Sequence, residues 1–273
     1  CRFLEEAGRI LRLPRLAVAT SMVFLHRFFA KHSFAKHDRF EVAVACILLA
    51  AKTEESPKKL NVVIEECYKL KQRASADSNA KMEEEEFAKL KERILLLERV
   101  ILHTIGFELS IDHPYKFLVD QIKTLTQRRL IEYEKPPVSS STKQPLSASQ
   151  VQSKLLNNLM QAAMNFSNDS MHTSLCLQYP PKLIAIACVY LSAHYHRIRP
   201  TGGKNWLSLF QQQNMDVEIL ASICMQIIEL IADKKGQDMT VFKSVRADLD
   251  RLRSTKRSAS DVPSPPGAKR PRT

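Results

Sequence analysis

The stretch that decides the fold is residues 40–52, FEVAVACILLAAK, in which Glu41 is the only polar residue before Lys52. A helix that is apolar on every side belongs in the middle of a bundle, where other helices surround it. Its alanines allow those helices to approach closely. The run is much shorter than the ~20 apolar residues needed to cross a bilayer. We therefore predict a buried core helix that ends at Lys52, before the helix-stopping segment 53–57, TEESP.

On both sides of this helix the chain keeps the character of an all-α protein. It contains only 6 Gly, and it lacks the alternating Val, Thr or Tyr runs with Asn-Gly or Asp-Gly turns that are typical of strands. Apolar residues recur at helical spacing instead. The predicted helices cover residues 2–13, 15–31, 38–52, 58–71, about 80–105, 113–126, 151–172, 181–194, 205–212, 216–233 and 239–252.

Charge and cysteine content limit the class of protein. The formal net charge is +12, from 41 Lys and Arg less 29 Asp and Glu, which fits either a soluble basic protein or one with an anionic partner such as nucleic acid. The 6 cysteines are scattered, without a CxxC pair or a histidine at zinc spacing. We therefore expect no metal site, and a reducing compartment, the cytosol or the nucleus. No secretory signal or transmembrane run is visible, so no membrane contact is expected, and because residue 1 is Cys we expect a truncated N-terminus.

An internal repeat organises the helices. A shift of 142 residues places 22–26, MVFLH, over 164–168, MNFSN, and places 45–52, ACILLAAK, over 187–194, ACVYLSAH. One offset satisfies both helices and the distance between them. We therefore predict two copies of one helical bundle, each built round an all-apolar helix.

Enzyme signatures are missing from the sequence. We find no GxGxxG, GxxxxGKS/T, GxSxG or HExxH motif, and the 8 histidines do not pair at a spacing of four with a carboxylate between them. His194 and His196 point to opposite sides of a helix end, and we interpret both as polar surface residues. The sequence predicts no catalytic residue, no cofactor and no catalysis by this chain alone.

Two charged residues interrupt the apolar pattern. On a helical projection Glu98 lies inside the apolar arc of its helix, where a bare carboxylate is costly to desolvate and needs a cation. Lys52 lies one turn beyond the core of its own helix, and we predict that it pairs with Glu98. The pair is either an internal salt bridge or the polar part of a docking surface, with Phe107 and Leu109 as its apolar part. The second copy has His194 in place of Lys52, which favours the docking surface.

Four segments carry a resemblance to a known family: 26–29, HRFF; 50–60, AAKTEESPKKL; 106–114, GFELSIDHP; and 174–179, SLCLQY. They resemble the cyclins, specifically the transcription-associated cyclin T and cyclin K type, over residues 2–232. The resemblance implies two tandem five-helix cyclin boxes followed by a disordered basic C-terminal tail. The expected organisation is a first box at 1–112, the first helix of a second box at 113–126, a linker or insertion at 127–149, the rest of the second box at 150–235, a possible surface helix at 239–252 and the tail at 253–273.

The resemblance also implies a function, that of a non-catalytic regulatory subunit that binds and activates a cyclin-dependent kinase. The charged pair of the family that contacts the mobile helix of the kinase falls on Lys52 and Glu98, and the neighbouring hydrophobic contacts fall on Phe107 and Leu109. For this subfamily the substrate is the C-terminal domain of RNA polymerase II, phosphorylated to promote elongation. The resemblance leaves open whether the chain is T-like or K-like, and which kinase is the partner.

Independently of the family resemblance, the tail is predicted to contain a nuclear-localisation signal. Two basic clusters in a flexible segment suit an import receptor, although such clusters also serve as solubilising tails. The candidate residues are Lys256, Arg257, Lys269, Arg270 and Arg272, and Ser264 before Pro265 is a possible phosphorylation site.

Two other functions fit a double helical repeat. A general transcription factor with a double cyclin fold would bind DNA and polymerase without a kinase. It is expected to show a zinc ribbon and basic residues along the repeat helices, whereas much of the positive charge here lies in loops and the tail. Direct nucleic-acid binding stays open. The third reading is a free-standing helical scaffold.

Overall fold

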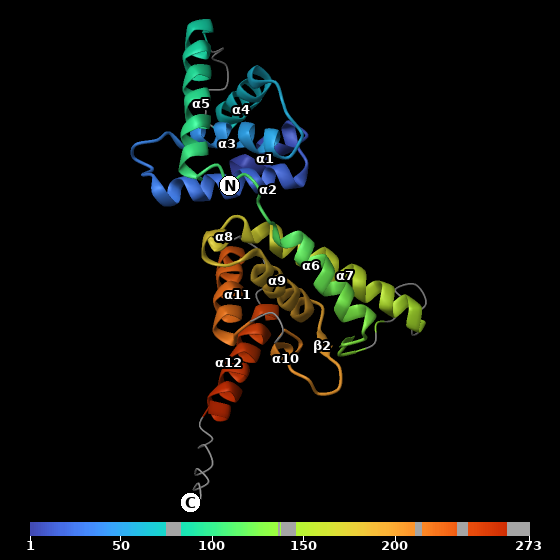
Figure 1. The fold of residues 1–273 in the computed structure, drawn as a ribbon. Coiled ribbons are helices and arrows are strands. Elements are labelled where there is room, and N and C mark those ends of the chain that lie inside the picture. Colours follow the sequence, from blue (N-terminus) through green and yellow to red (C-terminus); the bar gives the residue numbers. More distant parts are fainter. Residues whose placement is uncertain (75–82, 136, 138–145, 211–214, 234–239, 261–273) are drawn as a thin grey trace, which may run out of the picture.

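The protein forms two helical bundles stacked one above the other (Figure 1). The computed structural model describes residues 1–74, 83–135, 137, 146–210, 215–233 and 240–260. The first bundle contains α1 (Arg2–Ile10), α2 (Arg15–Lys31), α3 (Arg39–Thr53), α4 (Leu60–Ala74) and α5 (Glu84–Thr104). The second contains α6 (Pro114–Gln127), α7 (Ala148–Ser170), the short α8 (Leu175–Gln178), α9 (Pro181–Tyr195), α10 (Trp206–Phe210) and α11 (Val217–Ala232). Each bundle encloses its own apolar core, which confirms the predicted all-α fold.

Helices α3 and α9 form the centres of the two bundles. Residues 42–51 of α3 and 184–193 of α9 are all buried, as expected of helices that are apolar on every side. The side chain of Asp38 caps α3, accepting hydrogen bonds from the backbone N–H groups of Phe40 and Glu41 at 2.8 and 3.0 Å. Both ends of α9 lie 142 residues after the ends of α3. The structure therefore confirms the internal repeat.

The predicted linker at 127–149 is partly regular structure. Strand β1 (Ile131–Tyr133) pairs antiparallel with β2 (Ile198–Pro200), and Ile131 and Ile198 are buried. Ser147 caps α7, which begins at Ala148, by accepting a hydrogen bond from the backbone of Gln150. Both ends of the segment are therefore regular structure and Ile131 is buried, although residues 127–129 and 147–149 are exposed as predicted, while residues 136 and 138–145 lie outside the described part. Three-residue strands are too short to show a period of two, so the sequence pattern missed them.

The last helix is longer than predicted. Helix α12 runs over Thr240–Ser260 instead of 239–252. Its buried side chains, spaced by three and four residues, hold it on the second bundle: Phe242, Val245, Leu249 and Leu252. Residues 253–260 are thus helical, and the predicted start of the tail at 253 is wrong. Helix α1 differs in the other direction and ends at Ile10, three residues before its predicted end.

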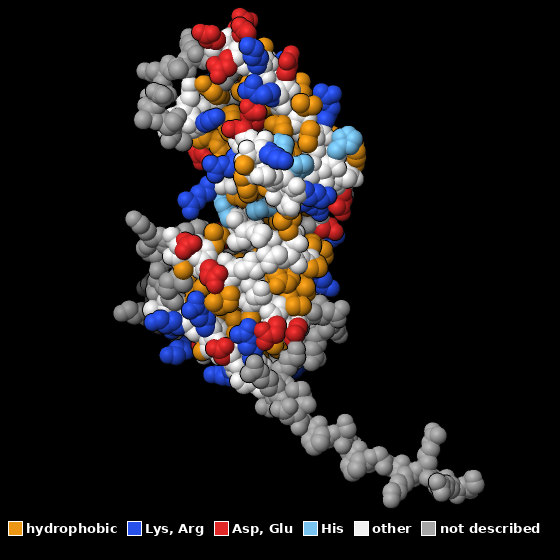
Figure 2. Space-filling view, turned by 90° about the vertical axis from the view of Figure 1, so that its left-hand side faces the viewer, with side chains coloured by type: hydrophobic (Ala, Val, Ile, Leu, Met, Phe, Trp, Pro, Cys, Tyr) orange, Lys and Arg blue, Asp and Glu red, His pale blue; other side chains and the backbone are white. Residues whose placement is uncertain are grey.

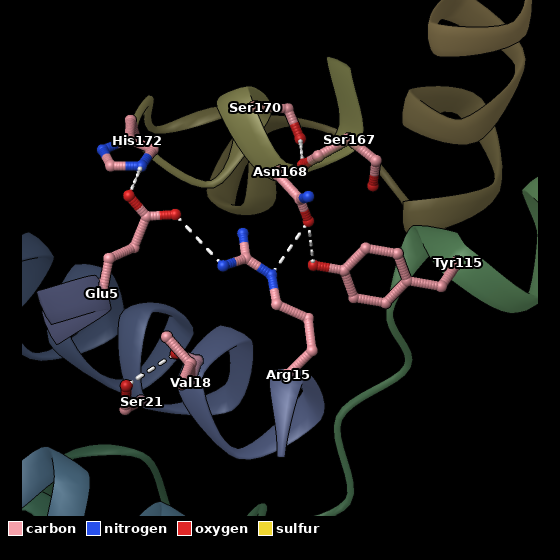
Figure 3. Close-up of polar contacts among 9 residues, drawn as sticks. All are labelled: Glu5, Arg15, Val18, Ser21, Tyr115, Ser167, Asn168, Ser170 and His172. Atoms are coloured by element: carbon pink, nitrogen blue, oxygen red, sulfur yellow. Dashed lines mark hydrogen bonds and ion pairs between the residues drawn. The ribbon is translucent and has the colours of Figure 1, made fainter. Parts of the chain in front are cut away.

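A polar cluster joins the two bundles (Figure 3). Arg15 on α2 donates from Nε to Oδ1 of Asn168 on α7 at 2.9 Å, and the hydroxyl of Tyr115 on α6 donates to the same oxygen at 2.9 Å. Arg15 also reaches Oε1 of Glu5 at 3.1 Å, and the other oxygen of Glu5 lies 3.1 Å from Nε2 of His172. The cluster therefore fixes how one bundle lies on the other.

Replacing Arg15 by alanine is expected to lower the free energy of unfolding by about 1–2 kcal/mol, because it removes one charge-assisted and one ionic contact between partly exposed groups. Urea unfolding measures the change. Arg128→Ala is the matched control, since no ion pair joins Arg128 to another described residue. Equal losses in both variants would contradict the role of the cluster.

Two histidines, the buried His113 and the partly buried His26, lie at the same junction. His26 donates from Nε2 to the carbonyl of Met171 at 2.9 Å. Nε2 of His113 lies 2.7 Å from Oγ1 of Thr20, whose hydroxyl donates to Glu54 at 2.7 Å, so this imidazole is the donor to Thr20. Burial lowers the pKa of both His26 and His113 below the ordinary value, because the charged imidazolium loses its hydration.

Acidification is therefore expected to destabilise the chain between about pH 7.5 and 5.5. A histidine whose folded pKa is lowered binds more protons when unfolded in this window, so the free energy of unfolding falls as the pH falls, by at most about 1.4 kcal/mol per pH unit for each histidine. Urea unfolding at both pH values measures this slope. His113→Gln should make the slope shallower, and an unchanged slope would show that His113 does not contribute.

Candidate functional site

Lys52 and Glu98 form the ion pair that the sequence predicts. Lys52, in the last turn of α3, donates from Nζ to both carboxylate oxygens of Glu98 on α5, at 2.7 and 2.9 Å. The side chain of Glu98 is only 10% exposed, whereas that of Lys52 is 50% exposed. The ammonium group of Lys52 donates two of its three N–H groups to Glu98, and no other described residue accepts a hydrogen bond from it. Glu98 is therefore buried, whereas the side chain of Lys52 is accessible from solvent.

The segment after α3 is held in place from the bundle junction. Thr53 donates from its hydroxyl to the carbonyl of Leu49 at 3.0 Å, and the backbone N–H of Ser56 bonds the carbonyl of Ala51 at 2.9 Å. Glu54 accepts the hydroxyl of Thr20. Sequence reasoning did not find Thr20, because a threonine inside an apolar helix gives no local signal. These hydrogen bonds fix the backbone conformation of the residues directly after Lys52.

Phe107 lies exposed just after α5. Gly106, at φ +66°, follows the C-cap of α5, and the backbone N–H of Phe107 donates to the carbonyl of Leu102 at 2.9 Å, which is the usual glycine-dependent termination. Phe107 itself has φ +58° and is 59% exposed, with its ring 5.2 Å from that of His103. A bulky residue with positive φ is strained. Neither the strain nor the exposure is explained by packing.

Leu109 is placed differently from Phe107. Its side chain is half-buried and packs against the core of the first bundle. Glu98 and Phe107 are nine residues apart along α5 and its end, so roughly 10–14 Å separate them at 1.5 Å per residue. An amphipathic helix of three turns spans that distance. The four candidate residues therefore consist of an ion pair between Lys52 and Glu98, the exposed ring of Phe107 and the half-buried aliphatic side chain of Leu109.

The counterpart of Lys52 in the second bundle is not a surface residue, so that prediction is wrong. His194 is 16% exposed, and its Nε2 lies 3.3 Å from Oδ2 of Asp248 on α12. The hydroxyl of Tyr190 donates to the same oxygen at 2.8 Å. The second bundle thus keeps an acid beside this position, but it takes that acid from α12. Within the described helices of the repeat itself, the second bundle lacks an ion pair equivalent to that of Lys52 and Glu98.

The other candidate residues divide between described and undescribed segments. Lys256 and Arg257 belong to the last turns of α12, whereas Ser264, Lys269, Arg270 and Arg272 lie outside the described residues. Within the described segments, no group of three or more His, Cys, Asp and Glu side chains is placed to hold a metal ion. A search of the same segments for membrane spans finds no helix with the length and apolarity to cross a bilayer.

The cysteines of the two cores are unreactive. All 6 are free, and burial raises the pKa of Cys67 to about 12 and that of Cys176 to about 11. Burial raises the pKa of Cys46, Cys188 and Cys224 still further. A thiol that stays protonated is a poor nucleophile. These residues serve as small apolar side chains.

Two tandem helical bundles, each built round an apolar central helix, with a lysine–glutamate pair exposed on the first, define the double-box class of helical proteins. Residues 1–110 match the family described as "Cyclin, N-terminal domain". Cyclin-T1-3 of Oryza sativa subsp. japonica is 35% identical over 233 residues, 84% of this chain and 41% of the relative. Cyclin-L1 of Homo sapiens is 30% identical over 263 residues, 96% of this chain and 44% of the relative. The chain belongs to the cyclin family, and it resembles the transcription-associated members.

The fold also resembles that of a solved structure. A chain in the crystal structure of the yeast RNA Pol II CTD kinase CTDK-1 complex matches 97% of this chain and 76% of its own length, with a TM-score of 0.63 and 18% sequence identity. This likeness concerns the fold. The chain spans less than half the length of the curated relatives that it matches.

Proposed function

We propose that this chain is the regulatory subunit of a cyclin-dependent kinase that phosphorylates the C-terminal domain of RNA polymerase II and promotes elongation. Its kinase-docking face consists of Lys52, Glu98, Phe107 and Leu109. The observation that carries the proposal is the half-open pair, in which Glu98 is buried while Lys52 is 50% exposed. The names of the relatives and the kinase complex of similar fold support it.

The geometry of the face suits a helix of the kinase. Glu98 holds the ammonium group of Lys52 in one position, so the entropy of ordering that side chain is already lost before binding. The uncommitted N–H of Lys52 can then donate to a carbonyl or carboxylate of the partner. Phe107 adds a large apolar surface that contributes little while it faces water. The charged contact orients the partner helix and the ring supplies affinity.

The chain acts on the kinase by selecting a conformation. A cyclin that binds better to the kinase state in which the catalytic lysine–glutamate pair is assembled shifts the population toward that state. The chemistry stays with the kinase, a serine/threonine kinase, and the chain supplies no reacting group. Nuclear import through Lys256, Arg257 and the basic residues beyond 260 would bring the complex to the polymerase.

The DNA-binding alternative has less support. On the face drawn in Figure 2, Lys and Arg side chains alternate with acidic and hydrophobic ones and form no continuous basic stripe. A continuous stripe is the electrostatic footprint of nucleic-acid binding. The net charge of +12 alone does not supply it.

The test is to co-purify the chain with candidate kinases and to measure phosphorylation of the polymerase C-terminal domain. We expect the wild-type chain to activate one of them, and Lys52→Ala and Glu98→Ala to activate poorly. Arg93→Ala is the matched control, because Arg93 near the middle of α5 pairs with Glu41 at the N-terminal end of α3 at 2.9 Å, so the variant removes another ion pair between the same two helices. Activation of no kinase, together with salt-sensitive binding to duplex DNA, would favour the alternative.

A further inference from the structure

The second bundle has a site that corresponds to the docking face of the first. The offset of 142 that relates α3 to α9 places Lys52 on His194. An offset of 126 relates α5 to α11, because it places buried positions of one helix on buried positions of the other. The pairs matched by this offset are Ile94 and Leu220, Glu98 and Cys224, Ile101 and Ile227, and Ile105 and Ile231. The second bundle therefore has a histidine and a cysteine where the first has the ion pair.

Helix α12 lies on this site (Figure 1). Asp248 supplies the acid that Cys224 cannot, and it bonds Tyr190 and faces His194 on α9. Arg253 donates from Nε and Nη2 to the carboxylate of Glu218 on α11 at 3.1 and 2.9 Å, and so ties α12 to the second helix of the site.

The apolar side of α12 enters the edge of the second core. Val245 is 0% and Leu249 2% exposed, and the ring of Phe242 lies 6.3 Å from that of Phe166 on α7. These contacts are of the kind that an amphipathic helix makes in a hydrophobic groove.

The described part of the first bundle does without a helix in the position of α12. The core of the first bundle is formed by α1 to α5, with Met171 and Cys176 of the α8 region packed against it, and none of the described residues forms a helix on it that corresponds to α12. In the second bundle α12 contributes only Phe242, Val245 and Leu249 to a core that the other helices already supply. Helix α12 is thus related to the second bundle as a bound helix is related to its receptor.

We propose that α12 is an intramolecular ligand, seated in a second helix-docking site that the repeat has retained. The site takes an amphipathic helix with apolar residues at a spacing of three, four and three, and with a carboxylate directly before the third of them, as Asp248 stands before Leu249. Because α12 fills it, the first bundle alone is open to a partner helix. This last consequence rests on the proposed kinase function, whereas the exchange of α12 does not.

The experiment uses the full chain with a protease site inserted within residues 234–239. After cleavage, an excess of a fluorescently labelled peptide of residues 240–260 is added. We expect one labelled peptide to replace α12 on each chain, while hydrogen exchange shows α9 and α11 still protected. In the uncut wild-type chain, the amides of α12 should exchange faster than those of α9, through local opening.

Variant peptides test the contacts. Leu249→Asp should abolish binding, and Asp248→Asn should weaken it about tenfold, since it weakens one charge-assisted hydrogen bond. Lys243→Gln, at an exposed position, should bind like the parent peptide. Failure of the labelled peptide to exchange, or loss of protection in α9 and α11 on cleavage, would overturn the proposal. None of these experiments measures kinase activation. A negative result in them therefore contradicts the role of α12 as a ligand and leaves the proposed kinase function unaffected.

Discussion

Replacement of Lys52 by glutamate is expected to reduce kinase activation by at least about thirtyfold. The variant places a second carboxylate against the buried Glu98, whose two oxygens now lie 2.7 and 2.9 Å from Nζ of Lys52. It also removes the donor offered to the partner. Loss of one member of such a pair commonly costs 2–5 kcal/mol, and every 1.4 kcal/mol is about tenfold. Phosphorylation of the polymerase C-terminal domain by the reconstituted complex measures the effect.

A charge exchange separates the two readings of the pair. The double variant with Lys52→Glu and Glu98→Lys keeps an ion pair between α3 and α5 but reverses its direction. If the pair only holds the bundle together, the double variant recovers both stability and activation. We expect it to recover much of the stability, measured by urea unfolding, and none of the activation. Full recovery of activation would refute the docking role of Lys52.

Replacement of Phe24 by alanine is expected to lower the free energy of unfolding by about 3–5 kcal/mol, the usual cost of emptying a buried phenylalanine site. Phe24 lies on α2, is 0% exposed and belongs to the core that surrounds α3. The repeat places Phe166 at the same position of the second bundle, where it is 7% exposed. Urea unfolding followed by circular dichroism provides the measurement.

Phe107→Ala is the matched control for the core variant. The same side chain is removed, but from a position that is 59% exposed, so stability should change by no more than about 0.5 kcal/mol. Kinase affinity should nevertheless fall, because the exposed ring is an apolar anchor of the docking face. A large loss of stability in Phe107→Ala, or unchanged kinase affinity, would show that the ring has a structural role only.

Much of the fold could be predicted because helical periodicity is a local property of the chain. Helix α2 has the predicted bounds, Arg15–Lys31, since Pro14 precedes it and its apolar residues end with it. Helix α9 differs from its prediction by one residue at its C-terminal end. The two short strands were missed because their hydrogen bonds join segments that are far apart in the sequence. The predicted end of α12 is too early because its last turns carry no apolar residue larger than Ala259 that would mark them as helical.

The sequence predicted that Lys52 pairs with Glu98, but it did not predict which of the two side chains is exposed. A carboxylate in an apolar arc needs a cation, so Glu98 and Lys52 could be matched without coordinates. Which of the two faces water depends on how α5 crosses α3. The prediction that His194 is a surface residue was wrong for the same reason, because Asp248 lies beside His194 only through the packing of α12.

Local sequence patterns are sufficient to predict that the chain folds as two copies of one helical bundle, and that Lys52 pairs with Glu98. Tertiary structure alone decided how closely the helices approach: a Cβ at Gly8 would lie 2.3 Å from Cγ2 of Val18. It also decided how the bundles meet, through Arg15 and Asn168, which are 153 residues apart. Periodicity is written into each helix separately, whereas the approach and crossing of helices depend on side chains from several elements at once.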